Sequence, residues 1–244
     1  MNLKTVQANA IKSVFEVLKD LLNDVNFIFD EDGVRVTTLD TAHVTYVNMF
    51  LDASNFEVYD CKHRIVAGLN ISNTFKILKI IGNNDTLTMS TDTNEIMDIL
   101  IENSQKKSNT TFNLKLLDIN EETYNANDLM FDVMTVMPSV NLQRIIRDMY
   151  NFSQIVYISR KGKYITLSCK GDFVDQKTEI ECADDFEGSI EYSYSLKYIN
   201  MFTKATNICS NVSIHQNQDG AIMFRYSIAN LGDVDFYLAP NAEV

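Results

Sequence analysis

Apolar residues near the start of the chain recur every three or four positions, which is the period of an α-helix. They are Ile11, Val14, Phe15, Leu18, Leu21 and Leu22. The same spacing predicts three further amphipathic helices, at Ser72–Ile81, Ser139–Met149 and Leu196–Thr206. We expect Ser139 and Ser195 to cap two of these helices, because a serine hydroxyl can accept a hydrogen bond from a free N–H of the first turn.

Between the helices the pattern changes to short alternating or β-branched runs, which predict strands. In the first half these are Val25–Phe29, Val34–Leu39, His43–Leu51, Glu57–Cys61, Thr86–Ser90, Ile96–Glu102 and Thr110–Leu117. In the second half they are Phe131–Met137, Ile155–Ser159, Tyr164–Cys169, Thr178–Cys182, Ser189–Tyr194, Val212–Gln216, Ala221–Ala229 and Val234–Leu238. Gly33 and Gly162 each lie between two of these strands, and we expect a hairpin turn at both.

The two halves repeat one order of elements: helix, strands, helix, strands. Leu142 stands in the second half where Ile11 stands in the first, and Gly162 corresponds to Gly33, as in an internal duplication. A polar, acidic and aperiodic stretch separates the halves and suits a solvated connector. We therefore predict an α+β fold with helices on one side of antiparallel sheets. The expected boundaries are an N-terminal domain at 1–117, a connector at 118–128 and a C-terminal domain at 129–244.

Charge is distributed unevenly along the chain. Its 244 residues include 33 Asp and Glu against 21 Lys and Arg, and the net charge of −12 argues against nucleic-acid binding by the surface as a whole. The four predicted helices nevertheless carry pairs of basic residues and few acids. The pairs are Lys12 and Lys19, Lys76 and Lys79, Arg144 and Arg147, and Lys197 and Lys204. A single basic helix can be explained as a solvated helix face. Four basic helices on an acidic chain indicate a surface that attracts nucleic acid.

Other kinds of chemistry find little support in the sequence. The four cysteines are scattered without a C-x-x-C pair, so we expect free thiols and no metal site or cofactor. Asp30 and Asp32 lie in a predicted tight turn that lacks the remaining ligands of a calcium loop. Neither a nucleophile motif nor a phosphate-binding glycine loop is present, which argues against an enzyme. No apolar run approaches the roughly 18 residues of a membrane span, and we expect no membrane partner.

Six short motifs occur in order along the chain. They are Leu39-Asp40-Thr41-Ala42-His43-Val44, Tyr59-Asp60-Cys61, Lys76-Ile77-Leu78-Lys79, Met137-Pro138-Ser139, Phe202-Thr203-Lys204-Ala205-Thr206 and Tyr237-Leu238-Ala239-Pro240. Each motif is weak alone. Together, in a duplicated chain of this length, they make the sequence resemble the eukaryotic-type sliding clamps of the proliferating cell nuclear antigen family along essentially its whole length.

The resemblance implies a homotrimeric ring whose helices line a hole around double-stranded DNA. The eight basic residues would then contact phosphates without reading the base sequence. It also implies that Asn109–Leu117 of one subunit pairs with Gln176–Cys182 of the next. The expected function is that of a processivity factor for DNA polymerase. Further expected partners are a clamp loader and other replication and repair proteins with the family's short interaction motif. The family's location is the nucleus, or cytoplasmic replication sites for a viral member.

The resemblance further implies a groove that binds the partner motif. Its residues here would be Leu39, His43, Val44, Tyr46, Tyr124, Ala126, Ala221, Tyr237, Leu238, Ala239 and Pro240. Ala221 stands where the family usually has proline, which leaves the preferred partner sequence open. Lys161 is a candidate for the family's modified lysine. Two alternatives to the homotrimer remain: a subunit of a heterotrimeric checkpoint-type clamp, and a monomeric viral processivity factor.

Overall fold

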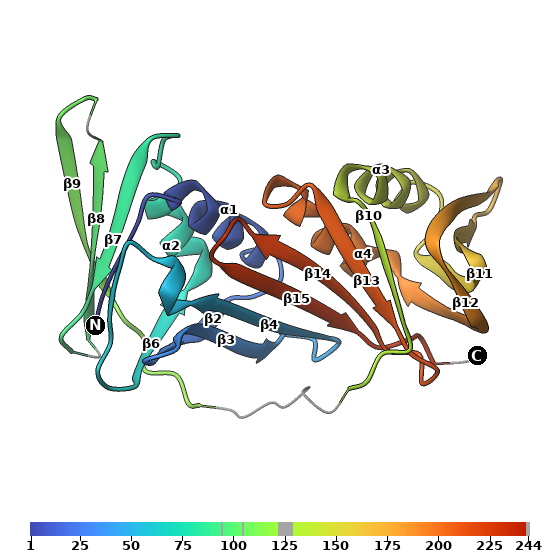
Figure 1. Ribbon diagram of the computed structural model, residues 1–244, viewed down its shortest axis with the longest axis horizontal. Coiled ribbons are helices and arrows are strands. Elements are labelled where there is room, and N and C mark those ends of the chain that lie inside the picture. Colours follow the sequence, from blue (N-terminus) through green and yellow to red (C-terminus); the bar gives the residue numbers. More distant parts are fainter. Residues whose placement is uncertain (94, 104, 122–128, 243–244) are drawn as a thin grey trace. The chain divides into compact units, whose positions relative to one another are not determined.

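The computed structural model describes residues 1–93, 95–103, 105–121 and 129–242 (Figure 1). The chain forms two compact units. The first comprises Met1–Thr41, Val47–Tyr124 and Ser227–Val234, and the second comprises Ala42–Tyr46, Asn125–Tyr226 and Asp235–Val244. Each unit therefore includes a short segment from the other half of the chain, which the periodicity of the sequence does not reveal.

Two helices pack against each other in the first unit: α1 (Ala8–Leu18) and α2 (Ile71–Leu78). The apolar face predicted for α1 is buried, and Leu21 and Leu22 are buried in the turn that follows the helix. α2 begins one residue before the predicted range because Asn70 caps it: the Asn70 side chain accepts a hydrogen bond from the Asn73 N–H at 2.9 Å.

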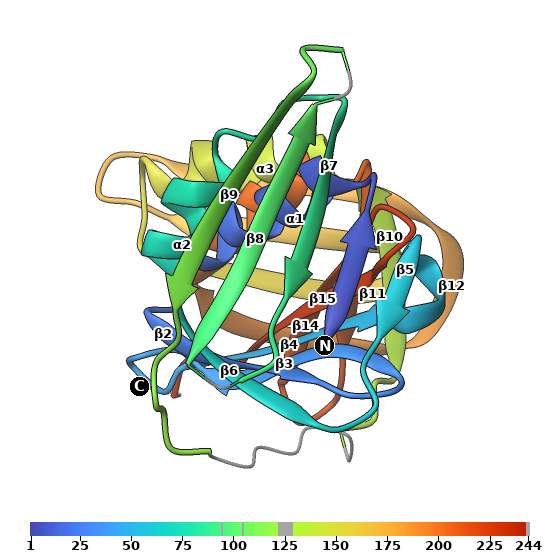
Figure 2. The ribbon, with the colours of Figure 1, turned by 90° about the vertical axis from the view of Figure 1, so that its left-hand side faces the viewer.

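Strands form two groups in the first unit, each with antiparallel neighbours where the pairing is described. Figure 2 shows the five-stranded sheet, ordered β5-β1-β7-β8-β9, with β9 at its edge. Its strands are β1 (Asn2–Thr5), β5 (Val58–Asp60), β7 (Asp85–Ser90), β8 (Ile96–Asn103) and β9 (Ser108–Lys115). The second group is ordered β4-β3-β2-β6, and a short 3₁₀ turn, η1 (Ala53–Asn55), follows β4. Its strands are β2 (Asp24–Phe29), β3 (Gly33–Leu39), β4 (Thr45–Asp52) and β6 (Ile65–Asn70). Only β1 and β6 lack a predicted counterpart.

The predicted turn at Gly33 is confirmed. The Asp30 carboxylate accepts hydrogen bonds from the N–H groups of Asp32 and Gly33, at 3.0 and 3.1 Å. The Tyr59 hydroxyl donates to the carbonyl oxygens of Asp30 and Gly33, at 2.7 and 2.6 Å. A Cβ on Gly33 would lie 2.0 Å from the carbonyl oxygen of Leu51, so this position requires glycine.

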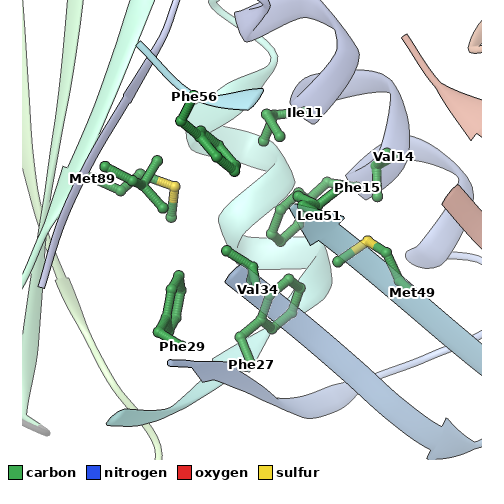
Figure 3. A pocket seen from close by; sticks show the side chains of 11 residues that line it. Ile11, Val14, Phe15, Phe27, Phe29, Val34, Met49, Leu51, Phe56 and Met89 are labelled. Atoms are coloured by element: carbon green, nitrogen blue, oxygen red, sulfur yellow. The ribbon is translucent and has the colours of Figure 1, made fainter. Parts of the chain in front are cut away.

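The core of the first unit encloses a small cavity of about 30 Å³ (Figure 3). Its lining is apolar: Leu3, Ile11, Val14, Phe15, Phe27, Phe29, Val34, Met49, Leu51, Phe56 and Met89. Because these side chains offer no hydrogen bonds, the cavity has nothing to hold a water molecule. α1 and the strands thus bury one apolar core between them.

The second unit repeats the helix pair as α3 (Ser139–Tyr150) and α4 (Leu196–Phe202). The prediction that Ser139 caps α3 is wrong. Its hydroxyl donates instead to the carbonyl oxygen of Cys209 at 2.6 Å, and Pro138 occupies the cap position. Ser195 occupies the cap position of α4, but its side chain makes no capping hydrogen bond.

The predicted helix Leu196–Thr206 is only partly α-helical, since it continues as a 3₁₀ turn, η2 (Thr203–Asn207). The Thr203 hydroxyl donates to the carbonyl oxygen of Asn200 at 2.9 Å, and Thr206 donates to that of Thr203 at 2.7 Å. Hydroxyl groups that bond to a carbonyl three residues earlier compete with the regular helical pattern. They accompany the tighter turn here.

The strands of the second unit are ordered β10-β13-β14-β15, with a separate antiparallel pair, β11 and β12. Their bounds are β10 (Val133–Pro138), β11 (Ile155–Lys170), β12 (Asp175–Ser195), β13 (Asn211–Gln216), β14 (Ile222–Ile228) and β15 (Gly232–Leu238). The predicted hairpin at Gly162 is wrong. β11 runs through this position, and both of its halves pair with β12. Gly162 has a φ of 55° and marks register shifts in β11 rather than a chain reversal.

Candidate nucleic-acid interface and partner site

Lys12 and Lys19 connect the two helices of the first unit. The Lys12 ammonium donates to the carbonyl oxygen of Ile81 at 2.8 Å, just beyond the end of α2. The Lys19 ammonium lies 4.2 Å from the centre of the Phe75 ring on α2, within the range of a cation–π contact. Both side chains are half-buried. These two predicted residues therefore also stabilise the packing of α1 on α2.

Lys76 and Lys79 are exposed at the end of α2. They stand three residues apart, so their side chains lie on neighbouring positions of one helix face. The Lys76 ammonium donates to the side-chain oxygen of Asn73 at 3.0 Å, an exposed contact that a phosphate oxygen can replace. Of the predicted bases in this unit, these two are the most accessible.

The second unit presents its four predicted bases at the surface. Arg144 and Arg147 are exposed on α3, Lys197 on α4, and Lys204 on η2. α3 and η2 are joined by a hydrogen bond from the Gln143 side-chain amide to the carbonyl oxygen of Thr203 at 3.0 Å. The arginines and lysines thus project from a packed pair of helical elements rather than from loops.

Acidic residues are scarce on these helices. Within α1, α2, α3, α4 and the turns that directly follow them, they are Glu16, Asp20 and Asp148, although the whole chain carries a net charge of −12. Cations on rigid helices can contact phosphate oxygens in any DNA sequence, because such contacts carry no base information. The helices of both units therefore offer what a sequence-independent DNA contact needs.

A chain of ring contacts in the second unit contains two of the predicted partner-site residues. Tyr46 meets Tyr237 edge-on at a ring separation of 5.2 Å, and Phe131 lies 6.3 Å from Tyr237. Phe131 also meets His215 edge-on at 5.6 Å. Sequence reasoning missed Phe131 and His215. No local signal joins them, because the pairing of β10 with β13 is what brings them together.

The four rings of this aromatic cluster are half-buried. Burial raises the pKa of Tyr237 to about 12. Burial also lowers the pKa of His215, and the nearby Arg225 guanidinium lowers it further. Arg225 makes a two-pronged ion pair with Asp235, at 2.7 and 2.8 Å. A neutral imidazole among aromatic rings makes this an apolar surface, of the kind that apolar peptide side chains bind.

Other predicted partner-site residues lie in the second unit. His43, Val44 and Ala239 are exposed, whereas Leu238 is buried with 2% of its surface accessible, so its side chain packs in the core. The Ala221 N–H donates to the side-chain oxygen of Asn217 at 2.8 Å. A further predicted residue, Pro240, packs against Gly220: a Cβ atom on Gly220 would come within 2.8 Å of the proline ring.

Leu39 belongs to the first unit, at the end of β3, and is half-buried. The two residues before it, Thr37 and Thr38, line a cleft of about 430 Å³. Residues 118–121, at the start of the predicted connector, line the same cleft together with residues of β2. Asn26 ties that segment to β2 by donating to the carbonyl oxygen of Ile119 at 3.1 Å. Tyr124 and Ala126 lie outside the described residues.

Asp30 and Asp32, which were considered above as possible metal ligands, have structural partners. Asp30 and Asp32 hold the turn described above, and Arg35 makes ion pairs with both. In the described part of the chain no group of three or more His, Cys, Asp or Glu side chains could hold a metal ion. Within the same residues, no helix is long and apolar enough to cross a membrane.

Comparison with known proteins covers both units. The profile described as "Proliferating cell nuclear antigen, N-terminal domain" matches residues 1–124, and the one described as "Proliferating cell nuclear antigen, C-terminal domain" matches residues 125–241. "Probable DNA polymerase sliding clamp 1" of Paramecium bursaria Chlorella virus 1 is 34% identical over 253 residues, covering 98% of this chain and 96% of the relative. "Proliferating cell nuclear antigen" of Dictyostelium discoideum is 31% identical over 254 residues, with 98% of each chain covered.

The duplicated α+β fold, the basic helices and these matches define a DNA sliding clamp, a class of protein that works without catalysis. The chain belongs to the proliferating cell nuclear antigen family.

Proposed function

We propose that this protein assembles as a homotrimeric ring around double-stranded DNA and tethers DNA polymerase to its template. The observation that carries the proposal is the presence of paired basic residues on the helices of both units of an otherwise acidic chain. The acidic remainder of the surface repels DNA, so the basic helices are where the duplex is attracted.

The proposed DNA contact uses the eight basic residues on the four helices and on the turns that directly follow them, where Lys19, Lys79 and Lys204 lie. Exposed Lys76, Lys79, Arg144 and Arg147 provide most of the attraction to phosphates, while Lys12 and Lys19 add charge from fixed positions against α2. Lys197 and Lys204 complete the set. Affinity should fall as salt rises, because each neutralised phosphate releases counterions.

Ring closure is proposed to pair the edge strand β9 of one subunit with the Gln176–Cys182 part of β12 of the next. β9 has β8 as its only neighbour in the described sheet, which supports this assignment. A strand with one open edge tends to pair with another chain. A head-to-tail contact of this kind generates a closed ring when the rotation per subunit fits.

Partner proteins are proposed to insert a short motif with one aliphatic and two aromatic anchors. In the second unit its site includes Tyr46, Tyr237 and the exposed residues near His43. The family resemblance adds Leu39 of the first unit to the proposed site. Phe131 extends this apolar surface beyond the residues predicted from the sequence. The expected partners are DNA polymerase, a clamp loader and other replication and repair proteins. The expected location is the nucleus, or cytoplasmic replication sites for a viral protein.

The proposed domain boundaries remain 1–117 and 129–244, with the connector at 118–128 between them. Residues 118–121 support the beginning of the connector, because they lie along β2 and β3 without forming a strand of their own.

Charge reversal tests the DNA-binding proposal. Replacing Lys76, Lys79, Arg144 and Arg147 by glutamate should abolish stimulation of processive synthesis. The mass of the assembled particle, measured by light scattering, should stay that of wild type. Each lost phosphate contact should also reduce the slope of log K against log salt by about 0.9. The matched control reverses four exposed lysines outside the helices: Lys62, Lys106, Lys107 and Lys163. Unchanged processivity, or an equal loss in the control, would contradict the assignment.

A further inference from the structure

Arg160 is a fully buried arginine in the second unit, with 0% of its surface exposed. Its guanidinium donates to the carbonyl oxygen of Gly162, to the carbonyl oxygen of Asp184 at 3.0 Å and to the Asp184 carboxylate at 3.1 Å. The Asp184 side chain is itself 56% exposed. A guanidinium keeps its charge when buried, so the protein retains a cation here at an energetic cost.

The register of the two long strands explains why a large donor fits at this position. Arg160 pairs with Ile190 and Tyr164 pairs with Glu181, so four residue steps on β11 face nine on β12. The surplus residues bulge out of β12 around Gly162, and the regular ladder is interrupted there. The Arg160 side chain occupies the interior of this irregular stretch. Its planar fork bridges the carbonyl groups of both strands.

In the first unit, Gly33 also has a side-chain donor at its carbonyl oxygen. There the Tyr59 hydroxyl donates to the carbonyl oxygen of Gly33 at 2.6 Å. Gly33 lies at the chain reversal between β2 and β3, whereas Gly162 lies within β11, yet in both units a side chain donates to the glycine carbonyl. In the second unit the donor is a charged fork that also reaches the opposite strand, which a phenol with one hydrogen cannot do.

Arg160 lies between two halves of the strand pair. The inner half pairs residues 155–161 with 189–195 and buries Val156, Ile158 and Tyr194. The outer half pairs residues 164–170 with 175–181 and buries Ile165 and Leu167. The outer half contains Gln176–Glu181, which is all but the last residue of the proposed Gln176–Cys182 edge. Whatever fixes the bulge between the halves also fixes the direction in which this edge projects.

We propose that Arg160 is a positioning residue for ring assembly, which holds the outer half of β11 and β12 in the orientation that a neighbouring copy of the chain requires. This inference rests on the proposed ring. It explains why a cation is buried here with its Nε atom lacking a partner among the described residues. Such an arrangement is poorly suited to maximal stability, but it fixes one geometry.

Hydrogen exchange of an Arg160→Met variant tests the positioning directly. Methionine keeps an unbranched side chain but removes all donors. Amides of Tyr164–Lys170 in the outer half should exchange at least about tenfold faster, because local openings expose them. Amides of Ile155–Ser159 and of α3 should keep their wild-type rates. A uniform increase across the second unit, or no change, would overturn the proposal.

Light scattering over a range of concentrations measures assembly in the same samples. The Arg160→Met trimer should dissociate at a subunit concentration at least about tenfold higher than wild type, which is about two decades in the equilibrium constant for a trimer dissociating into three subunits. Lys161→Met is the matched control, because it removes a neighbouring cation that is exposed, and it should retain wild-type values. An Arg160→Met variant that assembles like wild type would refute the role in assembly.

If the methionine variant does not fold, the Arg160→Lys variant tests whether Arg160 positions the outer half of β11 and β12. Lysine keeps the charge but lacks the fork, so faster exchange should again be confined to the outer half, with a smaller amplitude. Exchange and assembly identical to wild type would contradict the proposal. A wild-type protein that is monomeric at every concentration would refute the ring itself, while the exchange pattern would still decide whether Arg160 positions the outer half.

Discussion

Tyr59 and Arg160 show how one donor can hold an irregular stretch of β-structure. Each donates to the carbonyl oxygen of a glycine, Gly33 or Gly162. The Gly33 carbonyl also accepts a hydrogen bond from the Asp30 N–H at 3.1 Å, so Tyr59 adds a second donor there. A side-chain donor that reaches the carbonyl groups of a turn or bulge stabilises that conformation over its alternatives.

The Tyr59→Phe substitution removes one hydroxyl, whose single hydrogen is shared between two carbonyl oxygens at 2.6 and 2.7 Å. We expect a loss of about 1 kcal/mol in the free energy of unfolding, the net contribution of a typical hydrogen bond, because the Gly33 carbonyl keeps the Asp30 N–H as a donor. Urea denaturation measures the loss. Tyr164→Phe is the control, since this tyrosine is 46% exposed, and it should stay within about 0.5 kcal/mol of wild type. Equal effects of the two substitutions would show that the Tyr59 hydroxyl does not hold the turn.

His215 makes stability depend on pH. Burial holds its pKa below the ordinary value of 6.5 in the folded protein, so the unfolded chain binds a proton more readily. The contribution to stability is present above pH 6.5 and is lost as the pH falls from there through the lowered pKa. Denaturation at several pH values between about 7.5 and 5.5 should therefore show a declining free energy of unfolding.

His215→Gln should flatten that decline, because the titrating group is gone. The matched control is His63→Gln, which makes the same substitution at an exposed histidine, and His215→Gln should flatten the decline more than this control does. A decline of the same slope in the His215→Gln protein would mean that other groups cause it.

Secondary-structure elements were predictable wherever one periodicity extended over a whole element. The apolar stripe of α1 and the alternating pattern of β4 are examples. β6 was missed because its sequence, Ile65–Asn70, contains glycine and does not alternate between apolar and polar residues. The predicted cap at Ser139 failed because its hydroxyl finds the carbonyl of Cys209, a partner 70 residues away that no local rule anticipates.

In the candidate sites, too, local features could be predicted from the sequence and contacts between distant residues could not. Basic residues on helices could be recognised from charge and spacing alone, because both properties are local. The aromatic cluster could be predicted only in part. Phe131 and His215 meet through the pairing of β10 with β13, in which Met134 faces His215. Contacts between distant strands depend on the register in which the strands pair. That register is set by both strands together, so no short stretch of the sequence reveals it.

The partner site is tested by placing charge in it. A Leu39→Glu, Tyr46→Glu double variant should weaken binding of a peptide with one aliphatic and two aromatic anchors by at least about 2 kcal/mol, the size of a hot-spot effect. Isothermal titration calorimetry measures this loss. The control places glutamate at Val6 and Val58, which are 59% and 41% exposed in the first unit. A loss below about 1 kcal/mol in the double variant would place the site elsewhere.

At the scale of the whole molecule, the acidic net charge and the basic helices serve one function. A clamp must stay on DNA without being trapped at any sequence, so its contacts should be electrostatic and limited to the backbone. The acidic remainder of the chain disfavours DNA binding elsewhere on the protein. In the proposed ring, retention on DNA depends on ring closure rather than on affinity, which distinguishes a clamp from an ordinary DNA-binding protein.

Retention on circular DNA tests this central claim most directly. The protein is loaded by a clamp loader onto a closed circle, separated from free protein at a salt concentration that disrupts simple electrostatic binding, and measured before and after one cut linearises the circle. We predict that the protein stays on the closed circle and is lost from the cut DNA by sliding off its ends. Equal retention on both forms, or loss from the closed circle at this salt concentration, would contradict the account.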